Sequence, residues 1–157
     1  MPQIKHPNPE SSEKLAALAN EAVRAFREDN PEAFKELVEA FNGKSADLAL
    51  FGHGRFHVSV SKGDVDIQPD KLRGSGATGR GATTPETLLA VLEGRLTPLE
   101  AFFKGDLVAR ADSAELHRAY DYFVRFSDAA LRSKKMQQVV AIFRETFGPG
   151  AGEKQKA

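Results

Sequence analysis

The sequence predicts a single domain of the α+β class, in which helices cover one face of a curved, mostly antiparallel sheet. Apolar residues recur at helical spacing before residue 42, alternate with polar residues from 46 to 67, and return to helical spacing after 84. A chain of 157 residues is long enough for one sizeable core. We expect this domain to span residues 11–147, with a flexible arm at 1–10 and a flexible tail at 148–157.

Two amphipathic helices are predicted before the first strand. The first is expected to be capped by Ser11 or Ser12 and to end near Arg27. Asn30 and Pro31 suit the N-cap and first position of the second helix, because proline lacks a donor that the first turn leaves unpaired. Gly43 is placed to end it.

The next segment predicts a short strand followed by a β-hairpin. Residues 46–51 are mostly apolar, and residues 56–61 alternate between apolar and polar side chains. Lys62 and Gly63 form the expected turn, and the alternation resumes on the return strand up to Pro69. Proline ends the hairpin because it has no N–H group for the ladder.

Gly74–Thr83 is rich in glycine and is the weakest of the predicted strands. It contains the spacing G-x-G-x-x-G, which binds dinucleotides when the glycines follow a strand and open a helix. Here the next helix begins only at about Pro85, and Arg95 stands where a ribose-binding acidic residue is needed. We therefore expect an irregular edge strand rather than a nucleotide site.

The most informative stretch is Glu93–Asp112, which joins two helices and a strand at glycine corners. It follows an apolar helix that we expect Thr83 to cap. Gly94 suits the end of that helix, and Thr97–Pro98 suits the start of a short second helix. Gly105 is placed to end the short helix before a strand.

This stretch resembles the sterol carrier protein family, type two, and the resemblance extends over about Ala46–Phe126. The shared pattern G-x-L-x-P-x-x-A-F-F-x-G-x-L-x-x-x-x-D is matched at Gly94, Leu96, Pro98, Ala101, Phe102, Phe103, Gly105, Leu107 and Asp112. The resemblance implies a mixed domain with an apolar tunnel for a lipid-like ligand. The expected tunnel lining comprises Leu88, Leu92, Leu99, Phe102, Phe103, Leu107, Tyr120, Phe123 and Phe126.

The phenylalanines of the second half of the chain have two interpretations. As core they would fill the space between sheet and helices, and as tunnel lining they would surround a ligand. Periodicity alone does not choose between these and by itself favours core, whereas the family resemblance favours the tunnel. The residues concerned are Phe102, Phe103, Phe123, Phe126, Phe143 and Phe147.

Two helices are predicted to complete the domain, the first capped by Ser113 and the second spanning Ser133–Phe147. The second helix has an apolar stripe and lies outside the region of resemblance. An amphipathic helix must bury its stripe. We expect this one to close the tunnel mouth as a lid or to pack on a neighbouring subunit.

Composition excludes several classes of function. Lysine and arginine total 22, as do aspartate and glutamate, so the net charge of zero argues against nucleic-acid partners and against steering to an anionic membrane. With no cysteine, the chain has no disulfide, thiolate metal site or cysteine nucleophile. No apolar run is long enough to span a membrane, and the N-terminus lacks the apolar core of a signal peptide. We therefore expect a cytoplasmic protein.

No catalytic or metal-binding constellation is evident. His53 and His57 are four residues apart but are expected on a turn and a strand, exposed to solvent. Asp64, Asp66 and Asp70 lack the glycine and the final glutamate of a calcium loop. We therefore predict no cofactor, no metal and no catalytic residue, which favours a carrier over an enzyme.

Three functions stay open at this stage. The leading hypothesis is binding and transport of a hydrophobic small molecule, such as a fatty acyl, sterol-like or isoprenoid lipid. The first alternative is an enzyme or accessory subunit acting on a hydrophobic biosynthetic intermediate. The second is a dimeric interaction module with a filled interior. Contact with a membrane would be at most transient, and a homodimer is left open.

Overall fold

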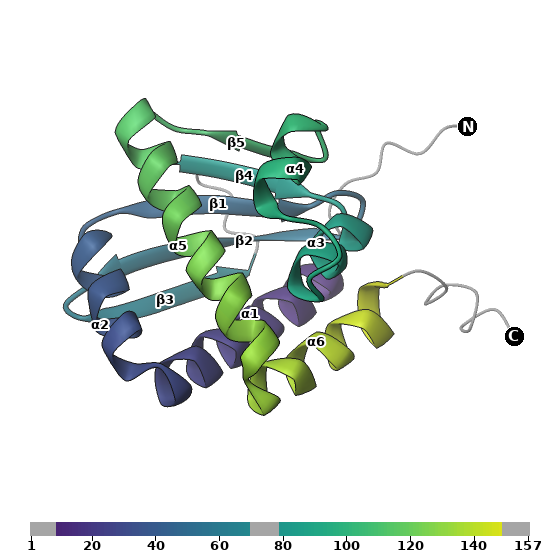
Figure 1. Cartoon of the computed structure of the whole chain (residues 1–157), viewed down its shortest axis with the longest axis horizontal. Helices are drawn as coiled ribbons and strands as arrows, with labels where there is room; N and C mark the ends of the chain where they lie inside the picture. The colour runs from purple at the N-terminus through teal and green to yellow at the C-terminus, as the bar shows by residue number, and fades with distance from the viewer. Residues whose placement is uncertain (1–8, 70–78, 149–157) are drawn as a thin grey trace, which may run out of the picture.

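The computed structural model describes residues 9–69 and 79–148. Two helices come first, followed by three strands, a fourth strand, two helices, a fifth strand and two final helices (Figure 1). In chain order the elements are α1 (Pro9–Asp29), α2 (Pro31–Ala40), β1 (Ser45–Leu50), β2 (Gly54–Ser61), β3 (Asp64–Pro69), β4 (Gly79–Thr83), α3 (Pro85–Leu92), α4 (Pro98–Phe103), β5 (Leu107–Arg110), α5 (Ser113–Arg132) and α6 (Lys134–Phe147).

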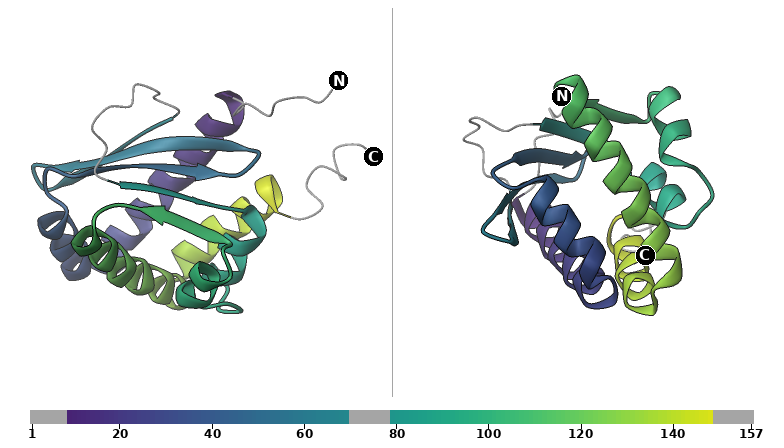
Figure 2. Two further views of the ribbon diagram at one scale, coloured as in Figure 1. Left: turned by 90° about the horizontal axis from the view of Figure 1, so that it is seen from above. Right: turned by 60° about the vertical axis from the view of Figure 1, so that its left-hand side comes forward.

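The five strands form one sheet in the order β3-β2-β1-β4-β5. Every pairing is antiparallel except that of β1 with β4, which is parallel. The helices gather on one side of the sheet, here called the helix side (Figure 2). No helix in the described ranges covers the other side, here called the open side. The predicted α+β class and the mostly antiparallel sheet are therefore confirmed.

Successive residues of each strand alternate between the two sides. Leu50 and Val60 are buried in the core on the helix side. Leu48 is two residues before Leu50 and therefore also lies on the helix side. Phe56 and Ala109 belong to the same cross-strand row as Leu48, so they lie on the helix side as well. Asp47 and His57 are register partners in the next row after Leu48 and Phe56, so they lie on the open side.

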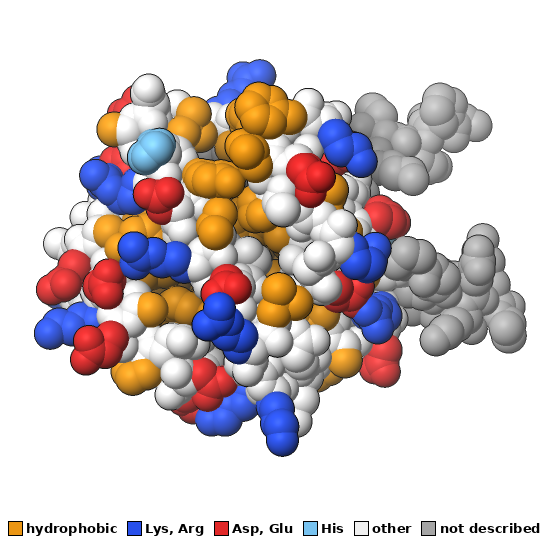
Figure 3. All heavy atoms as spheres, viewed as in Figure 1, with side chains coloured by type: hydrophobic (Ala, Val, Ile, Leu, Met, Phe, Trp, Pro, Cys, Tyr) orange, Lys and Arg blue, Asp and Glu red, His pale blue; other side chains and the backbone are white. Residues whose placement is uncertain are grey.

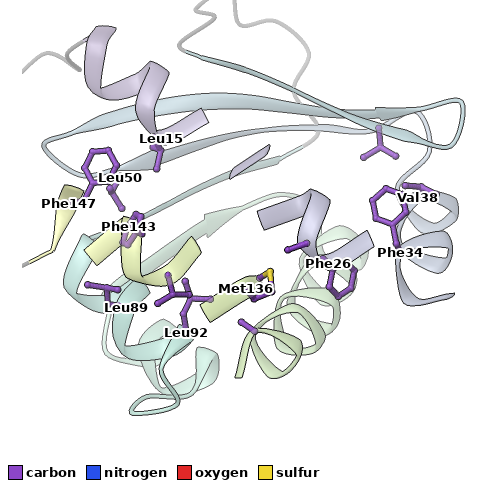
Figure 4. Close-up of a cluster of buried hydrophobic side chains, with 14 residues drawn as sticks. Leu15, Phe26, Phe34, Val38, Leu50, Leu89, Leu92, Met136, Phe143 and Phe147 are labelled. Atoms are coloured by element: carbon purple, nitrogen blue, oxygen red, sulfur yellow. The ribbon is translucent and has the colours of Figure 1, made fainter. Parts of the chain in front are cut away.

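The main core is formed by side chains from all the long helices and from the sheet (Figure 4). Phe26 of α1, Leu89 of α3 and Met136 of α6 are each at most 2% exposed. Phe26 also contacts Phe126 of α5, with ring centroids 5.4 Å apart. The core thus lies toward the C-terminal half of α5, and the N-terminal half of that helix is outside it.

Helix α6 belongs to this core. Met136, Val140, Phe143 and Phe147 are all buried, and the helix packs against α1, α3 and α5. Ser133 caps α6 by accepting a hydrogen bond from the N–H of Met136 at 3.1 Å, and its hydroxyl also bonds to Asp29 at the end of α1. The expectation of a lid or a subunit contact was therefore wrong, because the stripe is covered by the chain's own helices.

Three predicted helix starts differ from the structure by a few residues. Thr84 rather than Thr83 caps α3, and Asp112 rather than Ser113 caps α5. The hydroxyl of Thr83 is already engaged, since it donates to the carbonyl of Asp106 at 2.7 Å. Helix α1 begins at Pro9, so Ser12 lies inside it, fully buried.

The short helix α4 begins as predicted, with Thr97 as N-cap in a capping box with Glu100. The N–H and hydroxyl of Thr97 donate to the Glu100 carboxylate at 2.9 and 3.1 Å, and the Thr97 hydroxyl accepts from the Glu100 N–H. Hydrogen bonds from the Thr97 backbone and side chain hold the pKa of Glu100 below its ordinary value of 4.5. A group whose pKa is lowered on folding stabilises the fold above its unfolded pKa, and this contribution is lost in acid.

Replacing Glu100 with glutamine is therefore expected to lower the Tm relative to the wild type at pH 7. The difference should shrink as the pH falls below about 4.5 and through the lower pKa of the folded state, because protonated glutamate resembles glutamine there. Thermal unfolding followed by circular dichroism between about pH 3 and 7 measures this effect. A difference in Tm that stays constant over that interval would contradict the assignment.

Candidate ligand-binding groove

The centre of the sheet is incompletely covered on its helix side. Leu50 and Val60, at the ends of their strands, are buried in the core. Leu48, Phe56 and Ala109 face the same side, yet each of them is only half-buried. Side chains on this face point away from the sheet, so only the helix layer can cover them. Their residual exposure therefore means that the helix layer does not close over β1, β2 and β5.

Helix α5 crosses this part of the sheet without sealing it. Leu116, Tyr120 and Phe123 share a face that continues into Ser127 and Ala130 at spacings of three and four. Only Ser127 and Ala130 are buried, whereas Leu116 and Phe123 are half-buried and Tyr120 is 36% exposed. The N-terminal part of α5 therefore presents an apolar face that the protein's own side chains do not fill.

Helix α4 borders the same opening. It packs against β5 and α5, and three of its six residues are large, exposed and apolar. Leu99 is 46% exposed, Phe102 45% and Phe103 76%, with the two phenylalanine rings 5.9 Å apart. Figure 3 shows hydrophobic side chains gathered between α5 and the pair α3 and α4. We call this region the apolar groove, defined by Leu48, Phe56, Phe102, Leu107, Ala109, Leu116, Tyr120 and Phe123.

The structure divides the nine predicted lining residues into two groups. Leu92 lies in the main core, and Leu88 and Phe126 pack directly against it. The other six are outside that cluster, at the sheet, α4 and α5: Leu99, Phe102, Phe103, Leu107, Tyr120 and Phe123. The role of all nine in binding a ligand stays a prediction.

Four residues of the groove, three on strands and Leu116 on α5, were not among the predicted lining. Leu48, Phe56 and Ala109 lie on strands, and a strand pattern by itself does not say which face of its sheet a gap will leave uncovered. The signal available in the sequence was the alternation that assigns Phe56, Val58 and Val60 to one face. The parallel pairing of β1 with β4 then places Leu48 beside Gly81.

Gly81 shapes the floor of the groove. A Cβ atom added at this position would lie 3.0 Å from Cδ2 of Leu48, so the leucine side chain extends over the glycine. The glycine-rich composition of β4 therefore leaves room for a neighbouring side chain rather than an open void. The G-x-G-x-x-G spacing lies outside the described residues except for Gly79. The expectation of an edge strand was wrong, because β4 pairs with β1 on one side and with β5 on the other.

The two histidines that were expected at the surface have different environments. His57 lies on the open side, and its Nδ1 is 2.7 Å from the Asp47 carboxylate. His53 precedes β2 and its ring packs against Phe147 at 5.5 Å, so it is not a solvent-facing strand residue. Within the described residues no group of three or more histidine, cysteine or acidic side chains could hold a metal ion.

Asp64 and Asp66 are exposed as expected of a polar strand face, and Asp70 lies outside the described residues. In the part of the chain that the structure describes, no helix is sufficiently long and apolar to cross a membrane.

No protein-family model matches the chain, and no curated protein matches it by sequence. Solved structures do match. The first is a "UbiJ-SCP2 Ubiquinone synthesis protein", with 17% identity, a TM-score of 0.54, and coverage of 77% of this chain and 96% of the other. The second is the sterol carrier protein domain 2 of Helicoverpa armigera, with 16% identity, a TM-score of 0.56, and coverage of 77% and 93%.

These likenesses establish the fold. Both extend over nearly the whole length of the compared domain and over most of this chain. The chain therefore has the sterol carrier protein type-two fold, as the residues around Gly94–Asp112 predicted. At identities this low, the likeness concerns the fold alone.

Proposed function

We propose that this protein binds and carries a hydrophobic small molecule in the apolar groove. The observation that carries this proposal is the half-buried apolar surface shared by the sheet centre and the N-terminal half of α5. Apolar surface left without a protein partner on two facing layers is the environment in which an apolar ligand is stabilised.

The energetics favour a long or polycyclic ligand. Burial of each methylene group contributes about 0.8 kcal/mol, so a chain of about sixteen carbons gains on the order of 10 kcal/mol. Association costs roughly 4–15 kcal/mol in lost freedom, which leaves only a modest affinity for a short ligand. A fatty acyl, sterol-like or isoprenoid lipid meets this requirement, and the groove residues named above bring no charged anchor.

The fold likenesses support the same class of ligand. One matched structure is named a sterol carrier protein domain, and the other a ubiquinone synthesis protein. The second name gives specific support to an alternative, in which the chain presents a hydrophobic intermediate to biosynthetic enzymes. Copurification of a prenylated ring compound would favour that alternative, whereas a mixture of cellular fatty acids would favour a general carrier. A cytoplasmic location, at most transient membrane contact and homodimerisation stay predictions of the sequence.

Native mass spectrometry of the freshly purified protein, followed by solvent extraction, tests the proposal directly. The expected result is a mass excess of one lipid-sized molecule per chain, removed by extraction and restored by adding a fluorescent fatty acid. A protein that carries no extra mass and takes up no lipid after extraction would overturn the proposal and favour the filled interaction module.

Replacing Ala109 with phenylalanine is expected to weaken ligand binding, because the larger side chain would occupy part of the groove. Ala109 is half-buried on the helix side of β5, opposite Gly81 in the floor of the groove. The larger ring should weaken binding of a fluorescent fatty acid at least tenfold while Tm falls by only a few degrees. Ala141→Phe is the matched control because Ala141 is exposed on α6. Equal loss of binding in both variants, or in neither, would contradict the position of the groove.

A further inference from the structure

The open side of the sheet carries an unusual pair of arginines. Arg80 of β4 and Arg110 of β5 are directly opposite each other in the antiparallel register. Such partners have Cβ atoms about 4.5–5.5 Å apart, and like charges in this arrangement destabilise a sheet. Both side chains are exposed. The pairing is therefore expected to destabilise the sheet locally, and the packing of these exposed side chains does not explain it.

The acidic residue opposite Arg80 on β1 does not neutralise this pair. Asp47 is the register partner of Arg80 on β1, but its carboxylate is directed to His57, with Oδ1 2.7 Å from Nδ1. Among the described residues, the side chains of Arg80 and Arg110 form no ion pair or hydrogen bond. Two adjacent guanidinium groups are thus left available to an outside partner.

The pair borders a hollow of about 450 Å³ on the open side. Its rim combines a cationic row with an adjoining apolar row made by Ala49, Ala82 and Val108, which are register partners across β1, β4 and β5. Val108 is 42% exposed although it is a large apolar side chain. The hollow is also lined by Asp47, Leu48, Arg55, Phe56 and Gly81.

We propose that this hollow binds the anion of a phosphate monoester, with the phosphate between Arg80 and Arg110 and its apolar substituent on the alanine and valine row. Guanidinium groups are suited to this task because each presents several donors in a planar fork that matches such oxyanions. An anion between the two groups also removes their mutual repulsion. The volume of the hollow is within the range of small-molecule sites.

The arginine pair and the apolar row lie on the other side of the sheet from the groove side chains, although Leu48, Phe56 and Gly81 of the sheet border both the hollow and the groove. Arg80, Arg110 and Val108 lie on the opposite side of the sheet from Leu48 and Ala109. The proposal consequently does not depend on lipid binding in the groove, and a variant of one site leaves the residues of the other in place.

Phenyl phosphate is a suitable probe, because it joins a phosphate monoester to a small apolar ring. The experiment titrates it into the full-length protein and follows the methyl signals of Ala49, Ala82 and Val108 by NMR. We expect saturable shifts of these signals, and no such shifts with neutral benzyl alcohol. Arg80→Gln and Arg110→Gln should each weaken binding about tenfold, as loss of a charged hydrogen bond predicts, and the double variant should weaken it further.

Arg24→Gln/Arg132→Gln is the matched control, because it removes the same net charge from arginines paired with Glu21 and Asp128 on the helices. This control should bind phenyl phosphate as the wild type does. Folding is checked by Tm, which should be unchanged or higher in the double variant because a repulsive pair has been removed. Equal affinity in the double variant and the wild type, or the absence of methyl shifts in a folded wild-type protein, would overturn the proposal.

A second arm identifies the source of the anion. Vesicles of phosphatidylcholine containing phosphatidic acid present the same monoester in a bilayer, and co-sedimentation measures binding to them. Binding that is lost in Arg80→Gln/Arg110→Gln but kept in the control would identify a lipid headgroup as the partner. Binding of phenyl phosphate alone would identify a soluble anion, and both results support the site.

Discussion

Replacing Phe143 with alanine is expected to lower the free energy of unfolding by about 3–5 kcal/mol. Phe143 is 5% exposed, belongs to the main core and contacts the ring of Phe147 at 5.4 Å. Truncation would remove its buried apolar surface and leave a cavity between α6 and the core. For a domain of this size, the Tm should fall by roughly 6–20 °C.

Phe103 provides the control of identical chemistry. It is 76% exposed on α4, so Phe103→Ala should change the free energy of unfolding by no more than about 0.5 kcal/mol. Urea unfolding of the wild type and both variants measures the two values. Comparable losses in the two variants would show that α4 is packed more tightly than the structure indicates, and that Phe103 belongs to the core.

The second large effect is expected at Gly54, where α1 crosses the start of β2. A Cβ atom added there would lie 2.8 Å from the backbone N and the Oγ of Ser12 and 2.9 Å from its Cα. Two of these three atoms are backbone, so a change of side-chain rotamer cannot relieve the overlap. Gly54→Ala should therefore destabilise the fold by about 1–3 kcal/mol through displacement of α1.

Displacing α1 would also break a specific contact. The Oγ of Ser12, a fully buried residue, accepts a hydrogen bond from the N–H of Arg55 at 3.0 Å. Gly79→Ala is the matched control, because an added Cβ on β4 meets its nearest atoms only at 3.5 Å. Thermal unfolding of both variants measures the difference in their stability. A Gly54→Ala protein as stable as Gly79→Ala would mean that α1 does not approach β2 as closely as described.

Local chemistry accounts for the elements that were predicted well. The turn at Lys62–Gly63 and the helix ends at Gly94 and Gly105 depend on residues that enter left-handed conformations, and all of them have positive φ angles. Thr97 and Pro98 begin α4 for equally local reasons. Such features are decided within a few residues, so the amino-acid types alone predict them.

Helix caps with two adjacent candidates were predicted less well. Thr83 and Thr84 have identical side chains, as do Ser11 and Ser12, so the sequence does not show which residue of each pair caps the helix. The structure assigns Thr83 to the carbonyl of Asp106, twenty-three residues away, and Ser12 to the N–H of Arg55. A distant partner decides each case, which is why local rules selected the wrong residue.

Periodicity, helix caps and the Gly94–Asp112 pattern are all local in the chain, so the fold could be predicted from the amino-acid sequence. The tertiary structure alone decided what covers each apolar surface. It buried the stripe of α6 against α1, left Phe102 and Phe103 exposed on α4, and left Leu48 and Phe56 half-buried under α5. It also brought Arg80 opposite Arg110 across two strands. Burial and cross-strand pairing depend on segments that are distant in sequence, and composition and spacing do not encode their separation in space.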